Sequence, residues 1–323
     1  MGIDWDEFDK LDEKAQMKIF QDLVMSKDQQ SRNEFVLANL DEIGKRFMFA
    51  KKFMLLDILP EGFYKKSYWG VDTFTGESVV ILITKPDVIE HRKIKTDLPE
   101  EIMFRRECLV AYNLKHPNLA EFYEAGTTHD GQSYIAYKFD FNLENNLEKF
   151  LTEYELTAKQ AIKVLYNISR GLAYLHNNRL IHGDVKASNI IVSPRDLSAR
   201  LIDFGNIQLA GRENLKLTGS ISYTAPEVLD GKEITAAADV FGLGVVGYQM
   251  LYRKLPFSVS PEEWPDGLIE KIKTEEPRID KKFYFLKKML EKDPKKRLQS
   301  GKECMDELYW IRYLPLIFFE PFF

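Results

Sequence analysis

Residues 180–192 read LIHGDVKASNIIV, a polar insert between two short apolar runs. Both runs have the composition of buried strands, so the stretch predicts a strand, a loop and a second strand. A loop that is held at both ends by buried strands can aim its side chains rigidly. This loop carries Asp184, Lys186 and Asn189, and Asp203 follows shortly afterwards in the tripeptide DFG.

These four side chains are of the types that phosphoryl transfer requires. A carboxylate such as that of Asp184 can receive a hydroxyl proton, and the Lys186 ammonium can balance phosphate charge. Amide and carboxylate oxygens, here of Asn189 and Asp203, bind hard cations such as Mg²⁺. The alternative is a chance polar loop in an α/β protein, because Asp and Asn are ordinary turn residues.

The same stretch resembles the protein kinase family, whose catalytic loop reads H-R-D-x-K-x-x-N and is followed by D-F-G. This chain departs from that pattern only at Gly183, where the family has arginine. Three more motifs follow in the family's order: APE at 225–227, DVFGLG at 239–244 and DPKKR at 293–297. The resemblance covers roughly residues 51–310, which makes a chance loop a poor explanation.

The resemblance implies an α+β protein-kinase fold with two lobes, a small antiparallel β lobe and a larger, mainly helical lobe. A chain of 323 residues is long for one domain and suits two lobes. We expect the small lobe over residues 51–140 and the large lobe over 141–313. Residues 314–323 form an apolar tail, and we expect it to dock on the large lobe or on a partner.

Residues 1–50 are predicted to form an N-terminal helical extension of one or two amphipathic helices. The apolar residues that recur there at roughly helical spacing are Trp5, Phe8, Leu11, Ile19, Phe20, Leu23 and Val24. A helix packed on the small lobe for stability is the simpler interpretation. A regulatory arm is the alternative.

Composition excludes several classes of protein. Forty-five basic and 50 acidic side chains leave a net charge of -5, so there is no basic footprint for nucleic acid. Two cysteines, Cys108 and Cys304, cannot form a disulfide framework. The sequence contains no run of about eighteen apolar residues that would predict a transmembrane segment. Its first residues are acidic, whereas a secretory signal would begin with basic residues. We therefore expect a cytoplasmic protein.

The family's phosphate-binding elements are altered in this chain. Its glycine-rich loop, G-x-G-x-x-G, falls on PEGFYK at residues 60–65, where only Gly62 is kept. The third-strand lysine falls on Leu82, a loss that indicates a pseudokinase. The With-No-Lysine kinases, however, are similar to this chain in that their phosphate lysine comes from the third glycine position, which here is Lys65. The alternative is that Lys65 and Lys66 are two solvated lysines at a hairpin tip.

The resemblance also assigns the remaining nucleotide-binding residues. A helical pattern at 99–110 carries Glu107, which the family uses to pair the phosphate lysine; an exposed helix carboxylate is the alternative. A strand expected at 134–140 leads into the hinge, where the backbone of Lys138 and Phe139 meets adenine. ATP and Mg²⁺ are the implied cofactors.

Other residues have structural roles by the same resemblance. Asp239 is expected to brace the catalytic loop from a helix, and Glu227 with Arg297 to form a buried ion pair. A helix expected over 157–177 leads into the catalytic loop. Because Gly183 replaces the arginine that binds a phosphorylated activation segment, we expect activity that does not depend on phosphorylation there.

Three functions fit these observations. The first is a serine/threonine protein kinase that transfers the ATP γ-phosphate to hydroxyls of a protein substrate, with Lys65 replacing the missing lysine. The second is a pseudokinase that acts as a scaffold or allosteric binding module. The third is a small-molecule phosphotransferase, since the aminoglycoside phosphotransferases resemble the triplet at 182–184. Intact metal ligands favour the first function, and Lys186 with the APE motif argues against the third.

Overall fold

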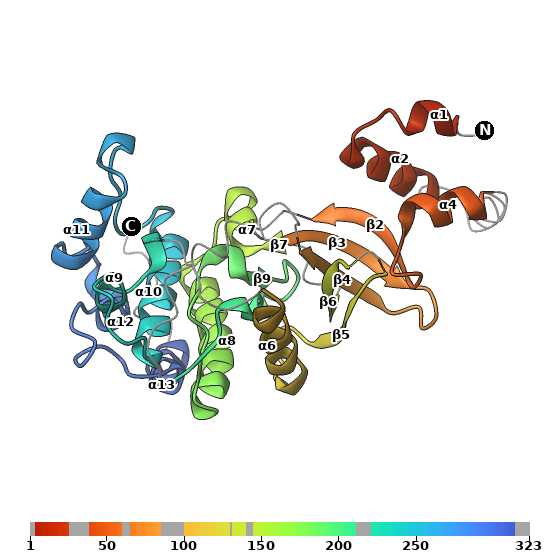
Figure 1. The fold of residues 1–323 in the computed structure, drawn as a ribbon. Coiled ribbons are helices and arrows are strands. Elements are labelled where there is room, and N and C mark those ends of the chain that lie inside the picture. Colours follow the sequence, from red (N-terminus) through yellow and green to blue (C-terminus); the bar gives the residue numbers. More distant parts are fainter. Residues whose placement is uncertain are drawn as a thin grey trace. The chain divides into compact units, whose positions relative to one another are not determined.

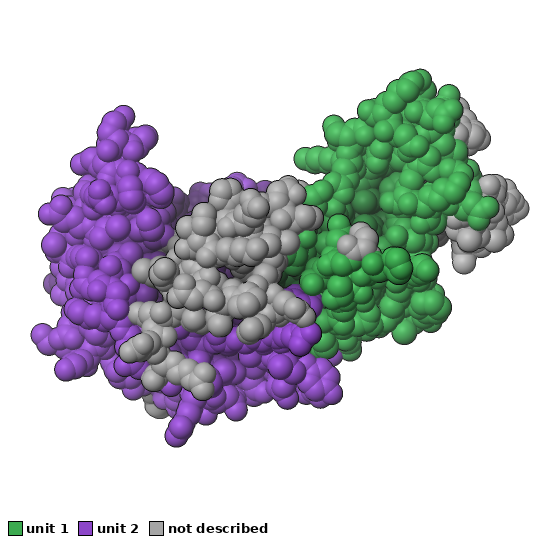
Figure 2. Space-filling model, in the orientation of Figure 1, with its two compact units in different colours: residues 1–94, 122–140 green, residues 95–121, 141–323 purple. Residues whose placement is uncertain are grey.

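The computed structural model describes residues 4–25, 39–59, 65–84, 100–129, 131–139, 145–210 and 221–313. The chain divides into two compact units (Figure 2). Residues 1–94 and 122–140 form the β unit, and residues 95–121 and 141–323 form the helical unit. An antiparallel sheet in the first and mainly helices in the second confirm the expected α+β fold class. The domain boundaries given above stay predictions, and the apolar tail lies outside the described residues.

A six-stranded antiparallel sheet forms the body of the β unit, in the order β1-β2-β3-β4-β6-β5 (Figure 1). Its strands are β1 (Met48–Phe49), β2 (Phe53–Leu59), β3 (Lys65–Asp72), β4 (Ser78–Thr84), β5 (Phe122–Thr127) and β6 (Ser133–Lys138). The strand expected at 134–140 is confirmed, with both ends shifted by one or two residues. Strands β2 and β4 both pair with β3, which therefore lies inside the sheet.

The described part of the N-terminal extension forms three helical segments rather than one or two. They are α1 (Trp5–Phe8), α2 (Glu13–Met25) and α4 (Leu40–Phe47), and α2 and α4 pack against β2. Helix α1 begins after Asp4, whose side chain accepts hydrogen bonds from the backbone N–H groups of the first turn.

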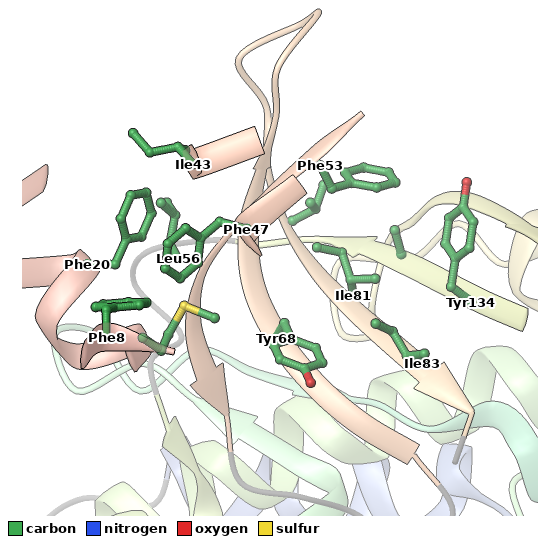
Figure 3. Packing of buried hydrophobic residues seen from close by; sticks show 13 residues of the cluster. Phe8, Phe20, Ile43, Phe47, Phe53, Leu56, Tyr68, Ile81, Ile83 and Tyr134 are labelled. Atoms are coloured by element: carbon green, nitrogen blue, oxygen red, sulfur yellow. The ribbon is translucent and has the colours of Figure 1, made fainter. Parts of the chain in front are cut away.

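Large apolar side chains fix the extension to the sheet. Figure 3 shows Phe8, Phe20 and Phe47 gathered around Leu56 of β2. The rings of Phe20 and Phe47 stack with their centroids 3.9 Å apart, and full burial of such a side chain contributes about 2–3 kcal/mol. Packing on the sheet agrees with the simpler interpretation of the extension. The apolar pattern was less reliable residue by residue, because Leu11 and Ile19 are 40% and 38% exposed.

A charge cluster around the buried Asp72 lies elsewhere in the β unit. The Lys52 ammonium lies 3.0 Å from a carboxylate oxygen of Asp72 and also pairs with Glu124. The Tyr123 hydroxyl donates to Asp72 over 2.6 Å, and the Tyr134 hydroxyl donates to Glu124 over 2.8 Å. Burial by itself would raise the pKa of Asp72. The hydrogen bonds that Asp72 accepts from Tyr123, Phe74, Lys52 and Thr75 outweigh the effect of burial and lower this pKa to about 2. Burial and the Glu124 charge raise the pKa of Tyr134 to about 12.

The helical unit is built around α8 and α10. Its helices are α6 (Glu100–Asn113), α7 (Leu147–Glu153), α8 (Ala158–Asn177), α9 (Pro226–Leu229), α10 (Ala236–Tyr252), α11 (Asp266–Thr274), α12 (Tyr284–Met289) and α13 (Gly301–Tyr313). Helix α8 confirms the helix expected over 157–177 and begins with a capping box between Thr157 and Gln160. Helix α10 is buried along nearly its whole length, which suits its almost uninterrupted apolar sequence.

Short strands and turns in this unit hold the polar segments. The strands are β7 (Asn145–Asn146), β8 (Leu180–Ile181), β9 (Ile190–Val192), β10 (Ala199–Leu201) and β11 (Gln208–Leu209). Strands β9 and β10 pair as an antiparallel hairpin, and β8 pairs with β11. Single 3₁₀ turns occupy η2 (Ala187–Asn189), η3 (Phe204–Asn206), η4 (Ile221–Tyr223), η5 (Pro261–Glu263) and η6 (Lys281–Phe283).

Candidate active site

The polar loop between β8 and β9 is fixed by one carboxylate of α10. Asp239 is 2% exposed, and its two oxygens accept the backbone N–H groups of His182 and Gly183, each over 2.8 Å. The ring Nε2 of His176 lies 2.9 Å from the same carboxylate. The predicted strand-loop-strand and the predicted brace are therefore both confirmed. Gly183 has a φ of +77°, a left-handed conformation that glycine adopts at little cost.

Asp184 is held asymmetrically. Its Oδ2 accepts hydrogen bonds from Lys186 Nζ at 2.7 Å, from Asn189 Nδ2 at 3.0 Å and from Asn206 Nδ2 at 3.4 Å. Within the described part of the chain, no residue donates to Oδ1. Three donors on one oxygen thus fix the orientation of the side chain. The contribution of Asn206 was not predicted, since nothing in the sequence marks an amide after the DFG motif.

Asn189 and Asp203 lie at the same end of the β9–β10 hairpin. The backbone N–H of Ile202 donates to the Asn189 carbonyl over 3.0 Å, which ties together the residues that precede β9 and follow β10. The Asn189 amide nitrogen donates to the carbonyl and carboxylate of Asp184, so its amide oxygen points away from that residue. Asp203 has a left-handed φ of 65°, and strain of this kind in a residue other than glycine is typical of functional sites.

This donor set fits a magnesium ion. One amide oxygen and one carboxylate are hard ligands, and Mg²⁺ in nucleotide sites takes its other ligands from phosphate and water. In the described ranges there is no group of three or more His, Cys, Asp or Glu side chains that could hold a metal ion by themselves. The pair alone would supply two of the ligands of such an ion.

Helix α6 is linked to the segment that follows Asp203. The guanidinium of Arg106 donates to the Ile207 carbonyl over 2.6 Å, a contact that the sequence did not predict. The neighbouring Glu107 is 3% exposed, which contradicts the alternative of a solvated helix carboxylate. Glu107 belongs to the helical unit and Lys65 to the β unit, so their pairing stays a prediction.

The two lysines at the start of β3 lie on opposite faces of the sheet, because successive strand residues alternate. Ser67 pairs with Leu82 across β3 and β4, which puts Lys65 and Leu82 on the same face. Lys66 faces the other side, where its Nζ lies 2.8 Å from Glu13 Oε2. Both lysines belong to strand β3, and the role of Lys65 stays a prediction, as does the alternative of two solvated lysines. Gly62 lies outside the described residues.

The end of β6 carries the predicted adenine-binding segment. The Phe139 N–H donates to the Ser78 carbonyl over 2.9 Å, so a hydrogen bond between Phe139 and adenine would fall to its carbonyl. The Phe139 ring lies 5.9 Å from the Trp69 ring, on the strand that carries Lys65. The Lys138 ammonium lies 4.0 Å from Glu77, and the predicted contact with adenine concerns the Lys138 backbone only.

The residues that lead into the APE motif pack beside Asp184. A cavity of about 30 Å³, large enough for one water molecule, is lined by Asp184, Tyr223 and Thr224 among others. Glu227 and Arg297 form the predicted buried ion pair, with two N–O distances of 2.7 and 2.9 Å. This pair fixes the APE motif to the end of the helical unit. Residues 211–220 lie outside the described residues.

Across the described parts of the chain, no helix is both long and apolar enough to cross a membrane.

Comparison with known proteins gives consistent results. The family model of the protein kinase domain matches residues 55–310. Protein kinase C-like 1 of Saccharomyces cerevisiae is 28% identical over 288 residues, which are 86% of this chain and 23% of that protein. Serine/threonine-protein kinase STY46 of Arabidopsis thaliana is 27% identical over 66% of this chain and 36% of its own length. Serine/threonine-protein kinase PknJ of Mycobacterium tuberculosis is 31% identical over 57% of this chain and 33% of its own length.

The chain thus spans between 23% and 36% of the length of these three relatives. The family model, by contrast, matches most of this chain, and the matched range includes the loop at 182–189, the DFG and APE motifs and the brace at Asp239. On these grounds the chain belongs to the protein kinase family.

Proposed function

We propose that this chain is an active serine/threonine protein kinase that transfers the γ-phosphate of ATP to hydroxyl groups of a protein substrate. The observation that carries the proposal is the asymmetric hold on Asp184, with three donors on Oδ2 and, within the described ranges, none on Oδ1. A scaffold has no physical need for a carboxylate that is fixed in this way. The relatives named above are serine/threonine protein kinases or protein kinases by name.

Asp184 and Lys186 would act on the transferred group. Oδ1 of Asp184 would accept the proton of the substrate hydroxyl as the hydroxyl oxygen forms its bond to the γ-phosphorus, and the bond from that phosphorus to the leaving ADP would break. Lys186, whose Nζ is 2.7 Å from Oδ2, brings its positive charge next to the phosphoryl oxygens and lowers the cost of the negative charge there. Both residues come from a loop that the Asp239 brace holds rigid, which favours a productive geometry.

The cation and the nucleotide would be held by residues of both units. Bound Mg²⁺ supplies positive charge that neutralises the phosphates, and the Asn189 amide oxygen and the Asp203 carboxylate would hold it. Lys65 would contact the α- and β-phosphates, with Glu107 as its partner.

Leu82 supports this assignment because an apolar side chain on the same face leaves Lys65 without a competing ammonium. Gly62 would approach the phosphates with its backbone, and the backbone of Lys138 and Phe139 would meet adenine. The assignments of Gly62, Lys138 and Phe139 follow the family's pattern, and that of Lys65 follows the resemblance to the With-No-Lysine kinases.

A phosphate-transfer assay with radiolabelled ATP and a generic protein substrate tests the proposal. Wild type should transfer phosphate, and Asp184→Asn should not. Lys65→Met should lower the rate by about 100-fold or more, as expected for loss of a charge on the phosphates. Lys66→Met is the matched control, because it removes an ammonium from the opposite face, and it should change the rate by less than about fivefold.

Three results would contradict the proposal. No transfer by wild type under any divalent cation would return the chain to the pseudokinase class. Equal rates for Lys65→Met and Lys66→Met would show that Lys65 is not the phosphate lysine. Transfer to an aminoglycoside but not to protein would favour the small-molecule phosphotransferases.

A further inference from the structure

A cavity of about 250 Å³ opens on the helical unit between α7, α8 and the turn that joins β9 to β10, and we call it the α7–α8 cavity. Phe150 and Tyr154 form part of its wall, and their rings stack with centroids 4.6 Å apart. Tyr154 is 46% exposed, so this aromatic pair is open to an occupant. Since a cavity of about 150 Å³ can hold benzene, this one has room for an aromatic side chain.

The turn between β9 and β10 supplies a fixed apolar wall. The Leu197 backbone N–H donates to the Ser193 carbonyl over 2.9 Å, and the Leu197 carbonyl accepts a 3.1 Å hydrogen bond from Asn167 of α8. Leu197 has a φ of +57°, which is uncommon for a bulky residue and persists only where the surrounding structure holds it. The wall therefore does not need an occupant to take its shape.

Two cations lie in the same wall. Lys163 of α8 and Arg195 of the turn line the cavity, and neither forms an ion pair within the ranges that the structure describes. The carboxylate of Asp196, which also lines the cavity, already accepts the backbone N–H and the hydroxyl of Ser198, over 3.0 and 2.9 Å. An occupant that is mostly apolar and carries one negative charge complements this wall.

Helix α13 leads the chain back toward this cavity. Its first residue, Gly301, lies against Leu172 and Ala173 in the last part of α8, and the Gly301 N–H donates to His176 over 3.0 Å. Helix α8 ends at Asn177, and α13 packs on α8 more extensively than on any other element. A helix of 13 residues is about 20 Å long, so α13 must run antiparallel to α8, toward its first turn.

A second set of contacts agrees with this direction. Leu286 of α12 and Leu165 of α8 both border Gly247. Two residues after Leu286, Lys288 pairs with Glu307 in the middle of α13 over 2.9 Å. The middle of α13 thus lies near the level of Leu165, whereas its start lies near the last turns of α8.

The end of α13, at Tyr313, therefore comes level with the first turns of α8, where Gln160 and Lys163 line the cavity. Residues 314–323 read LPLIFFEPFF, which is apolar except for Glu320. Ten residues reach at most about 35 Å, and a helix is about 10–12 Å across. The segment is long enough to pass around α8 and enter the cavity.

We propose that residues 314–323 dock in the α7–α8 cavity of their own chain, with Phe319 against the rings of Phe150 and Tyr154 and the Glu320 carboxylate beside Lys163 and Arg195. Docking removes an apolar segment from water. It also bridges α7, α8 and the β9–β10 turn, and α7 packs against η2 and β9. The inference does not depend on phosphate transfer.

Photocrosslinking in the full chain tests the proposal. The photoreactive residue benzoylphenylalanine replaces Phe319, which keeps an aromatic side chain at that position. After illumination, mass spectrometry should find the cross-linked partners within residues 150–163 and 193–198. The product should have the mass of a single chain, and its yield should not depend on protein concentration.

Matched variants make the site specific. Tyr154→Ala should lower the cross-link yield by about three- to tenfold, because it removes one ring of the stacked pair. Tyr284→Ala is the control, since Tyr284 is 56% exposed in the same unit but does not line the cavity, and it should change the yield by less than about twofold.

A charge exchange tests the contact of Glu320. Arg195→Glu should lower the yield by about two- to fivefold, and Glu320→Arg in the same chain should restore it, because the pair is then re-formed with its signs reversed. Arg195 is exposed, so this variant tests the cavity even where Tyr154→Ala lowers the melting temperature.

Several outcomes would overturn the proposal. Cross-links that lie elsewhere in the chain would show that the segment docks at another site. A product with the mass of two chains would show that the segment binds a second copy. Equal yields in Tyr154→Ala and Tyr284→Ala, together with an unchanged yield in Arg195→Glu, would show that the cavity does not hold the segment.

Discussion

Asp239→Asn should uncouple the catalytic loop from α10. In the wild type both carboxylate oxygens accept backbone N–H groups, from His182 and Gly183, at 2.8 Å each, with His176 at 2.9 Å. Asparagine has one acceptor oxygen in place of two and carries an NH₂ group in the other position. At least one buried backbone N–H must then face a donor, and the loop that carries Asp184 has to shift.

The size of the effect follows from the burial of the site. Asp239 is 2% exposed, so solvent cannot replace the lost acceptor. A hydrogen bond to a charged group contributes about 1.5–3 kcal/mol, and a buried unsatisfied donor costs about 1–3 kcal/mol. We expect Asp239→Asn to lower the free energy of unfolding by about 3–5 kcal/mol. A displacement of about 1 Å at Asp184 should also lower kcat by about 100-fold in the molecules that remain folded.

Urea unfolding and phosphate transfer measured on the same sample test this prediction. Asp230→Asn is the control, since Asp230 pairs with Lys232 and Lys273 at a partly exposed position and should cost less than about 1 kcal/mol. Similar losses of stability in both variants would contradict this prediction. A wild-type kcat in folded Asp239→Asn would also contradict it, because Asp184 would then not depend on the brace.

Three further predictions use matched variants or pH. Gly183 and Gly231 both have positive φ, but of the two only Gly183 would bring an added Cβ against a backbone oxygen, at 2.9 Å. Gly183→Ala should therefore lower the free energy of unfolding by about 2–3 kcal/mol and Gly231→Ala by about 1 kcal/mol. Equal losses in the two variants would contradict the role of this contact. Phe20→Ala should lower the free energy of unfolding by about 3–5 kcal/mol. Ile19→Ala, at a 38% exposed position of the same helix, should lower it by less than about 1 kcal/mol. Equal shifts of the melting temperature in the two variants would show that the extension is not anchored by this core. Folding lowers the pKa of Asp72 from 3.8 to about 2, so its negative charge stabilises the folded state by about 2 kcal/mol above about pH 5. This contribution is lost as the pH drops from about 4 to 2. Between about pH 6 and pH 3, the urea midpoint should therefore fall less steeply for Asp72→Asn than for wild type.

The sequence alone determined the parts of the site that are local in the chain. Asp184, Lys186 and Asn189 lie within one loop, and the apolar runs on either side predicted the strands that hold it. Their mutual hydrogen bonds follow from that short separation. The braces from Asp239 and from Glu227 with Arg297 join distant segments, and only the family resemblance predicted them.

Tertiary structure decided the contacts that depend on which surfaces pack together. Asn206 donates to Asp184 and Arg106 donates to Ile207, yet neither residue has a local signal, because an amide or guanidinium in a polar segment is equally suited to water. The apolar pattern of the extension likewise could not tell Phe20, fully buried, from Ile19, which is partly exposed, because helical spacing gives the apolar stripe but not its width.

The two lysines show this division most clearly. Alternation along a strand requires Lys65 and Lys66 to lie on opposite faces, and that much is in the sequence once β3 is recognised. Which lysine meets the N-terminal helices depends on the face of the sheet that those helices cover. The structure puts Lys66 against Glu13 and Lys65 on the face of Leu82. That choice is made by packing of the extension on the sheet, since the burial of its large apolar side chains is a property of the assembled fold and not of any one segment.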